Sequence, residues 1–128
     1  MAEMSNYLEN ALINGTLRNT AYTPVATVYV GLYTSDPTDA NTGTEVSGAS
    51  YARVAATFGA PSNGATSNTA AIEFPQATAS WGTVGWIGIL DASTTGNLLY
   101  HSPLDVSKVI DTGDVFKISI GNLTVTLA

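Results

Sequence analysis

His101 is the residue best suited to acid–base chemistry, because it is the only histidine of the chain and its ordinary pKa lies near neutrality. Asp105 follows on the same stretch of sequence. Nucleophilic catalysis would also need a hydroxyl activated by this imidazole, and no serine stands in a GxSxG elbow or a similar motif. We therefore predict no catalytic residues and no enzyme activity. We expect His101 to be a hydrogen-bonded residue at the surface or at a strand edge.

Two acidic segments offer oxygen ligands for a cation. The first, SDPTDANTGTEV, carries Asp36, Asp39, Asn41 and Glu45. A calcium loop places its ligands at alternate positions around an obligatory glycine, and this segment lacks that spacing. The second, DTGD at residues 111–114, lacks the partner loop and apolar flanks of an aspartic protease. We expect both to be turns, with no metal and no cofactor, and calcium at the first segment stays the open alternative.

The aromatic residues could form a platform for carbohydrate. Large rings more often fill a core or a subunit interface, where each removes about 150–250 Å² from water. In the stretch TVGWIGIL, Gly85 and Gly88 remove side chains beside Trp86, which lets another ring or backbone approach closely. We therefore expect Trp81 and Trp86 to pack in the core or in an assembly interface.

A short helix is predicted at the N-terminal segment SNYLENALINGTLRN. Ser5 or Asn6 can serve as its N-cap, and Glu9 completes a capping box with Asn6. Leu8 and Leu12 lie one turn apart on a shared face. A helix of about three turns is unstable alone. It must therefore dock on its own domain or on a neighbouring subunit.

The rest of the chain alternates apolar and polar residues with the period of β-strands. The alternating runs are VATVYVGLYT, YARVAATF, AAIEFP, TVGWIGILDA, LLYHSPL and VFKISIGNLTVTL. The last run breaks at Gly121 and Asn122, which predicts a bulge or a bend. About seven to eight short strands at this spacing predict an all-β fold, an antiparallel β-sandwich of jelly-roll or Ig-like type. We predict a helix or arm at residues 1–22 and the sandwich at residues 23–128.

Charge and composition exclude two classes of partner. The chain has 4 basic and 10 acidic residues, a net charge of −6, and the basic residues are scattered. Nucleic-acid binding needs clustered cations, so no nucleic-acid partner is expected. No apolar stretch approaches the roughly 20 residues that span a bilayer, and no export signal is evident, so no membrane partner is expected either. Only 11% of residues are charged, and an uncharged hydroxyl and amide surface suits a protein of an assembled particle.

Several blocks of the sequence resemble a family of small tailed-phage virion proteins that are often labelled tail fibre proteins. These blocks are SNYLENALINGTLRNTAY, ATVYVGLYTSDPTD and AAIEFPQATASWGTVGWIGILDA followed by GNLLYHSPL, and they include an F-P-x-A-x-x-x-W-G motif at residues 74–82. The resemblance covers residues 5–127 almost end to end. It implies a non-enzymatic β-sandwich component of the virion, on the capsid surface or the tail. It also implies synthesis in the bacterial cytoplasm, and the major capsid protein or tail proteins as partners.

A single small domain without repeats or heptads suits a capsid decoration, or cement, protein better than a long fibre. The alternative is a tail fibre or tail component that binds a host receptor or glycan through residues 35–50 and 59–69. We expect a homo-oligomer, with a trimer favoured because capsid threefold positions and fibres both use trimers. The predicted assembly residues are Tyr7, Leu8, Leu12, Trp81, Trp86 and Tyr100.

Overall fold

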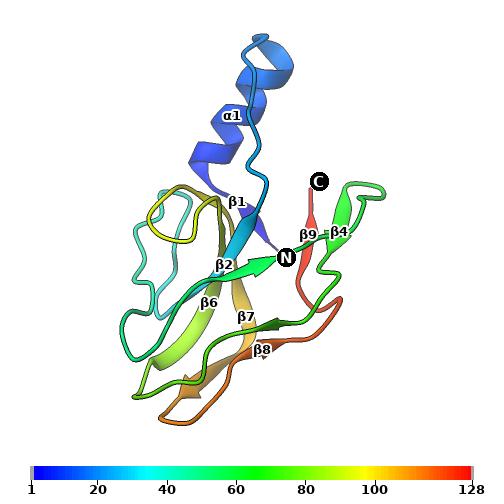
Figure 1. Ribbon diagram of the computed structural model, residues 1–128. Coiled ribbons are helices and arrows are strands. Elements are labelled where there is room, and N and C mark those ends of the chain that lie inside the picture. Colours follow the sequence, from blue (N-terminus) through cyan, green and yellow to red (C-terminus); the bar gives the residue numbers. More distant parts are fainter. Residues whose placement is uncertain (1, 128) are drawn as a thin grey trace.

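The computed structural model describes residues 2–127, and antiparallel β-strands make up most of its regular structure (Figure 1). One helix, α1, lies near the N-terminus. In chain order the elements are β1 (Glu3–Met4), α1 (Asn6–Leu17), β2 (Val28–Tyr33), β3 (Val54–Ala56), β4 (Ala65–Ser67), β5 (Ile72–Glu73), β6 (Gly82–Leu90), β7 (Leu98–Ile110), β8 (Lys117–Ile118) and β9 (Thr124–Thr126). The predicted all-β class with a short N-terminal helix is confirmed.

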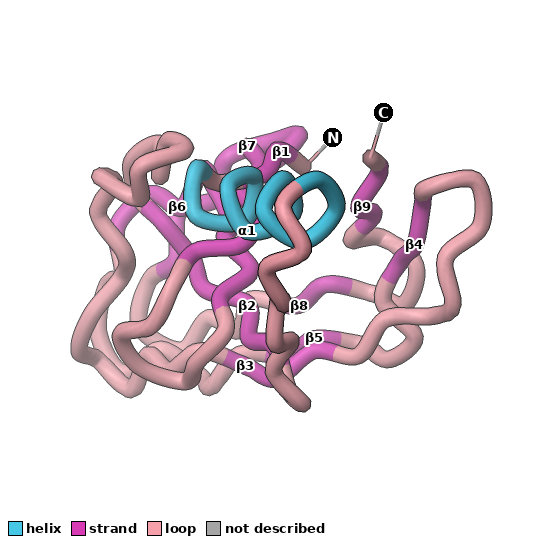
Figure 2. The backbone as a smooth tube through the Cα atoms, turned by 90° about the horizontal axis from the view of Figure 1, so that it is seen from above, coloured by secondary structure: helices cyan, strands magenta, loops and turns pink. Residues whose placement is uncertain are grey.

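The strands form one large sheet and two short pairs. The large sheet has the order β1-β7-β6-β2-β3, and every neighbouring pair in it is antiparallel. The short pairs are β4-β9 and β5-β8, which lie beside the large sheet in Figure 2. Val30 and Ile87 of the large sheet belong to one apolar core with Ile72, Phe74 and Phe116 of the β5-β8 side. The molecule is therefore a β-sandwich whose second layer is divided into two pairs.

Strand β2 shows the alternation that the sequence predicted, but both of its faces are covered. Val30 and Leu32 point into the core and are fully buried. Tyr33, on the opposite face, is only 2% exposed. The segment that follows β2 folds back beside it, because the Thr34 and Val46 amides donate to the Thr44 and Leu32 carbonyls, and Asn41 of this segment accepts from the Tyr33 hydroxyl. The large sheet thus has a second, smaller covered face.

Strand β7 is longer than the sequence predicted. The predicted run LLYHSPL ends at Leu104, but the strand continues through the segment DVSKVI to Ile110. It does so because β6 supplies a partner: Gly82, Thr83 and Val84 pair with Ile110, Val109 and Lys108. Long-range pairing therefore overrides a local pattern that lacks regular alternation.

The final alternating run is divided, as expected, by a turn at residues 120–121. Gly121 adopts a φ of +81°, which a residue without Cβ tolerates best. Asn68, only 1% exposed, pins this turn, because its amide accepts from the Leu123 N–H and donates to the Ser119 carbonyl. Ile120 shares the alternation of Phe116 in the sequence, but the turn leaves Ile120 65% exposed whereas Phe116 is buried.

Helix α1 projects from one end of the sandwich and contacts β7 at its base (Figure 1). Ser5 is its N-cap and accepts a hydrogen bond from the Leu8 N–H at 3.2 Å. The N-cap prediction is thus confirmed at Ser5, and a capping box between Asn6 and Glu9 is wrong because Asn6 already lies inside the helix. Leu8 is buried, so the helix docks on its own sandwich, which is the first of the two expected alternatives. Among the described residues, no helix is long and apolar enough to cross a membrane.

Candidate functional sites

The six predicted assembly residues differ in exposure. Leu8 and Trp81 are buried within the chain. Tyr7 on α1 is 43% exposed. Three more are half-buried: Leu12, Trp86 and Tyr100. Leu8 and Trp81 therefore stabilise the chain's own fold, and four of the six present surface that a partner can contact.

Trp81 lies within an aromatic cluster of the core. Its indole Nε1 donates to the Ala49 carbonyl at 3.0 Å. Its ring meets Tyr51 edge-on at 5.4 Å, and Tyr51 stacks on Phe74 at 6.2 Å. Phe74 in turn meets Phe116 edge-on at 5.7 Å. The prediction that Trp81 packs in the core is confirmed, and these rings form no exposed platform for a sugar.

Gly88 permits the close ring approach that the sequence predicted. A Cβ at this position would lie 2.9 Å from Cε1 of Tyr33 and 2.8 Å from Cδ1 of Leu98. At Gly85 the nearest neighbour of an added Cβ would be the Ser107 Cβ at 3.9 Å, which is an ordinary contact, so a small side chain would fit there. The ring that approaches β6 is therefore that of Tyr33 on the adjacent strand β2. It comes close at Gly88 and not at Gly85.

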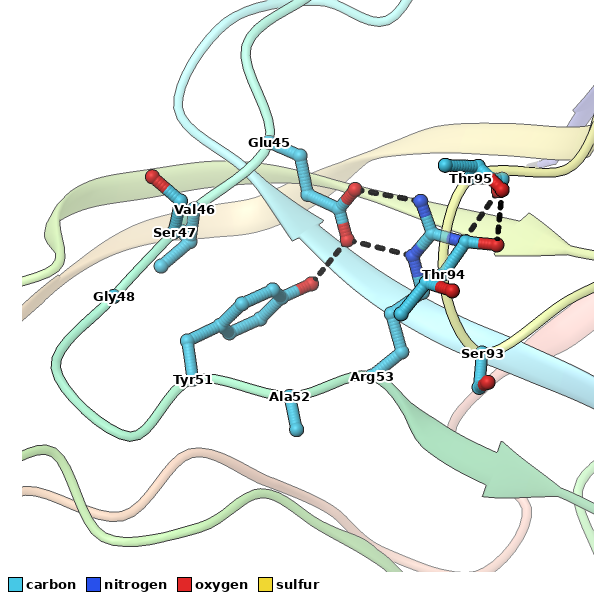
Figure 3. A pocket seen from close by; sticks show the side chains of 10 residues that line it. All are labelled: Glu45, Val46, Ser47, Gly48, Tyr51, Ala52, Arg53, Ser93, Thr94 and Thr95. Atoms are coloured by element: carbon cyan, nitrogen blue, oxygen red, sulfur yellow. Dashed lines mark hydrogen bonds and ion pairs between the residues drawn. The ribbon is translucent and has the colours of Figure 1, made fainter.

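A polar cluster of Glu45, Tyr51 and Arg53 lines a surface pocket of about 320 Å³ (Figure 3). Arg53 donates Nε and Nη2 to the two carboxylate oxygens of Glu45, each at 2.8 Å. The Tyr51 hydroxyl donates to the same carboxylate at 2.6 Å and accepts from the Leu32 N–H at 2.9 Å. Arg53 also donates Nη1 to the carbonyls of Ala92 and Thr95 in the β6–β7 loop. The cluster therefore ties three separate segments together.

The ionisation of this cluster is shifted toward the states that its hydrogen bonds need. Burial, followed by the hydrogen bond to Glu45, raises the pKa of the Tyr51 phenol well above its usual range. Burial also raises the pKa of Tyr33 to about 12, with the charge of Glu45 adding to the effect. The hydrogen bond to Glu45 raises the pKa of the Arg53 guanidinium. Both phenols thus stay neutral and Arg53 stays charged at neutral pH, which suits a structural clamp.

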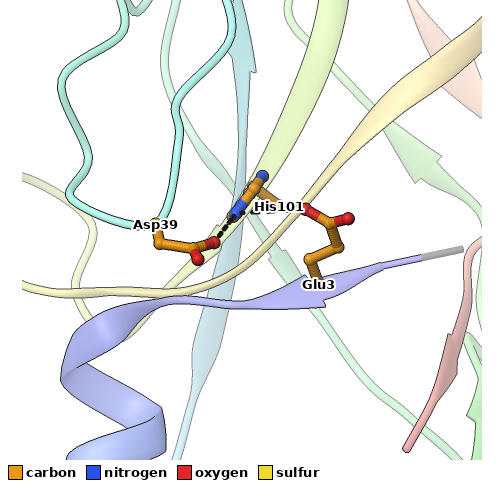
Figure 4. A group of neighbouring side chains, drawn as sticks. All are labelled: Glu3, Asp39 and His101. Atoms are coloured by element: carbon orange, nitrogen blue, oxygen red, sulfur yellow. Dashed lines mark hydrogen bonds and ion pairs between the residues drawn. The ribbon is translucent and has the colours of Figure 1, made fainter.

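A second polar cluster surrounds His101 (Figure 4). Its Nε2 lies 2.7 Å from Oδ1 of Asp39, which comes from the loop after β2, and 3.9 Å from Oε2 of Glu3 on β1. Its Nδ1 lies 4.0 Å from Oδ1 of Asp36. His101 is hydrogen-bonded, as expected. It is only 5% exposed rather than at the surface, because β1 pairs with β7 at this position and places Glu3 opposite it. Its partner is Asp39, 62 residues away, and not Asp105.

The residues of the first acidic segment do not converge on one point. Glu45 pairs with Arg53, and Asn41 accepts from the Tyr33 hydroxyl at 3.1 Å. Asp36 accepts from the Thr38 N–H at 2.9 Å, which makes the expected turn. Asp36 and Asp39 instead face His101 together with Glu3, a residue that no sequence pattern singles out.

The second acidic segment, DTGD, is also the turn that was expected. The Asp111 N–H donates to the Asp114 carboxylate at 2.9 Å, and the Asp114 N–H donates to the Asp111 carbonyl at 3.0 Å. Gly113 carries the positive φ of +90° that the turn requires.

The distal half of β7 is an exposed strand edge. β1 pairs with β7 only at Tyr100 and His101. Beyond this point, in the part of the chain that the structure describes, no strand pairs with the outer side of residues 105–109. The register with β6 shifts between Val84 and Trp86, so residues 104–107 form an irregular part of the strand. Val106 and Val109, both within residues 105–109, are 69% and 60% exposed. An edge of this kind can pair with another chain.

The fold and these surfaces define a structural protein. The polar clusters tie segments of the chain together, and the apolar residues that remain exposed suit contacts with other chains. The family model described as podophage GP4 fiber I protein gp80 matches residues 3–126, and the chain belongs to this family. It is thus a structural component of a phage virion, and the resemblance noted in the sequence is confirmed. No curated protein matches the sequence.

Proposed function

We propose that the chain is a subunit of a fibre on a tailed-phage virion, where it acts by assembly and without catalysis. The carrying observation is the family match over residues 3–126, because the family is described as a fiber protein. The sequence had favoured a capsid decoration protein and kept the fibre as the alternative. The family description supports that alternative, and because the chain is a single compact sandwich, we propose that it is one module of a larger fibre assembly.

We propose that the chain forms a homo-oligomer through the exposed part of β7, with a trimer favoured because fibres commonly use trimers. Val106 and Val109 offer apolar contacts there. Two single variants, Val106→Asp and Val109→Asp, should each lower self-association in sedimentation experiments. Neither should unfold the chain, because both side chains are exposed. Ala70→Asp, at an exposed loop position, is the matched control. Unchanged association in both valine variants would exclude this edge as the interface.

Host contact is a second candidate function, with the groove beside residues 59–69 as its site. This groove has a volume of about 530 Å³, and most of the residues that line it are serine or threonine, among them Ser62, Thr66 and Thr69. Neither residues 35–50 nor residues 59–69 contain a tyrosine, so hydroxyls and amides would have to make the contacts. Ser62→Arg should reduce adsorption of phage to host cells, whereas Thr94→Arg, in the β6–β7 loop, should not. Normal adsorption of Ser62→Arg phage would exclude the groove.

The location of the protein in intact particles tests the fibre proposal directly. Purified virions would be labelled with a gold-tagged antibody against this chain and imaged by electron microscopy. Label confined to fibres or the tail supports the proposal. Label spread over the head at high copy number would instead establish a decoration protein.

A further inference from the structure

Three carboxylates surround the buried imidazole of His101 without a compensating cation. Among residues 2–127, the only charged partner of Glu3, Asp36 and Asp39 is His101 itself. The basic residue of the neighbouring polar cluster, Arg53, is already paired with Glu45. Like charges held this close repel each other, and a neutral imidazole offsets none of that repulsion. A bound cation at this point would therefore stabilise the folded chain.

The donor atoms are arranged closely enough to share one ion. Nε2 of His101 and carboxylate oxygens of Glu3 and Asp39 all lie within 4.8 Å of one another. Tetrahedral zinc, with bonds of about 2.0–2.2 Å, holds its donors about 3.4 Å apart. To reach that spacing, the distance from Nε2 of His101 to Oδ1 of Asp39, 2.7 Å, must increase by about 0.7 Å. The distance from Nε2 to Oε2 of Glu3, 3.9 Å, must decrease by about 0.5 Å. The side chains of Asp39 and Glu3 are 47% and 71% exposed, so both can move without repacking the core.

We propose that Glu3, Asp39 and His101 bind a divalent transition-metal ion of the zinc class, with solvent as the remaining ligand. One imidazole nitrogen with two carboxylates suits zinc, whereas calcium requires six to eight oxygen donors. Asp36 stands behind the ring, 4.0 Å from Nδ1, and a small rotation of this exposed side chain would let it accept the Nδ1–H. A carboxylate in that position orients a metal-bound histidine and raises its basicity.

The ion would fix the base of the N-terminal arm. Its three ligands come from β1, from the loop after β2 and from β7. The same junction already holds two backbone hydrogen bonds, from the Asn6 N–H to the Asp39 carbonyl and from the Ser5 N–H to the Leu99 carbonyl, both at 2.9 Å. Because α1 starts at Asn6, metal binding would stabilise the direction in which the helix leaves the sandwich.

Metal titration of the purified, chelator-treated chain tests the proposal. Cobalt(II) should give the visible d–d absorption of a tetrahedral site, and zinc should displace it at one ion per chain. With free zinc about 100-fold above its Kd, the melting temperature should rise by about 10 °C. Glu3→Gln should weaken zinc binding about 10-fold or more. Asp105→Asn, the same change of charge on the exposed part of β7, should leave zinc binding unaltered.

Three results would overturn the proposal. One is the absence of a tetrahedral cobalt spectrum in the wild-type chain. Another is zinc binding that is equally strong in the wild type, Glu3→Gln and Asp39→Asn. The third is a wild-type chain whose melting temperature does not rise when zinc is added. Because Glu3 and Asp39 are exposed, both variants are expected to fold, so loss of binding in them can be attributed to the site.

Discussion

Replacement of Arg53 by methionine should remove about 3 kcal/mol of stability. Methionine keeps the apolar stem but loses both hydrogen bonds to Glu45 and both hydrogen bonds to the Ala92 and Thr95 carbonyls. The Arg53 side chain is 9% exposed, so its partners are largely shielded from water. Breaking a fully buried pair costs about 3–5 kcal/mol, and the 23% exposure of Glu45 places this pair at the lower end.

Urea denaturation monitored by tryptophan fluorescence measures this loss. Trp81 lies 5.4 Å from Tyr51, inside the region that the cluster supports, so its emission reports unfolding there. The midpoint should fall while the dependence on urea stays constant, because the change removes contacts without altering the surface that unfolding exposes. At a loss of about 3 kcal/mol the melting temperature should fall by about 10 °C.

Arg18→Met is the matched control, because the Arg18 side chain is exposed and its guanidinium donates to Oδ1 of Asn14 at 3.3 Å, a single exposed hydrogen bond. Its substitution should change stability by less than about 0.5 kcal/mol. A double-mutant cycle with Glu45→Gln separates the pair from the bonds to the loop carbonyls. If Arg53→Met cost no more than Arg18→Met, the cluster would be behaving as a solvated surface pair, and its role as a clamp would be refuted.

Three further predictions follow from local geometry. Gly88→Ala should cost about 1–3 kcal/mol by overpacking against Tyr33 and Leu98. Gly85→Ala, whose new methyl group would make only an ordinary contact, should be neutral or slightly stabilising in the same denaturation assay. Ser5→Ala should remove about 1 kcal/mol of stability at the N-cap of α1. Hydrogen exchange of the first amides of α1 should become faster while exchange in β6 stays unchanged. Equal exchange of the α1 amides in the wild type and the variant would contradict the capping role. Because the pKa of Tyr33 is raised from 10.0 to about 12 in the folded chain, its contribution to stability is complete below pH 10 and is lost as pH rises toward 12; Tyr33→Phe should flatten that part of the stability profile, and an unchanged slope would count against a buried neutral phenol.

Local patterns in the sequence predicted the strands that bury one face, but not how far each strand runs. The alternation in β2 and in the residues of β5 identified Val30, Leu32 and Ile72 as core residues because each is apolar at a two-residue spacing. The distal half of β7 has no regular apolar alternation, because it buries no continuous face: Val106 and Val109 are both exposed. Its strand conformation depends on pairing with β6, and pairing between distant segments leaves little trace in a local pattern.

The polar clusters show the same division. Glycine beside an aromatic residue predicted a close ring approach at Gly88, because the missing Cβ is itself the signal. Glu3 gave no comparable signal. It reaches His101 only because β1 pairs with β7 in a register that places these two residues opposite each other. Asp39 reaches the same imidazole from the loop after β2, so the cluster becomes visible only once the topology is known.

The junction of the N-terminal arm with the sandwich depends on specific polar contacts more than on apolar burial. Among residues 2–22, the buried side chains are those of Ala2, Ser5 and Leu8, a small apolar area for holding a projecting helix. The Ser5 hydroxyl both accepts from the Leu8 N–H and donates to the Leu98 carbonyl, and His101 bonds to Asp39 beside it. Hydrogen bonds of this kind add little net stability, yet leaving one unpaired is costly, so they specify one orientation. The direction of α1 is therefore well defined although its attachment is weaker than the core, and changes at Ser5 should loosen the helix before they unfold the sandwich.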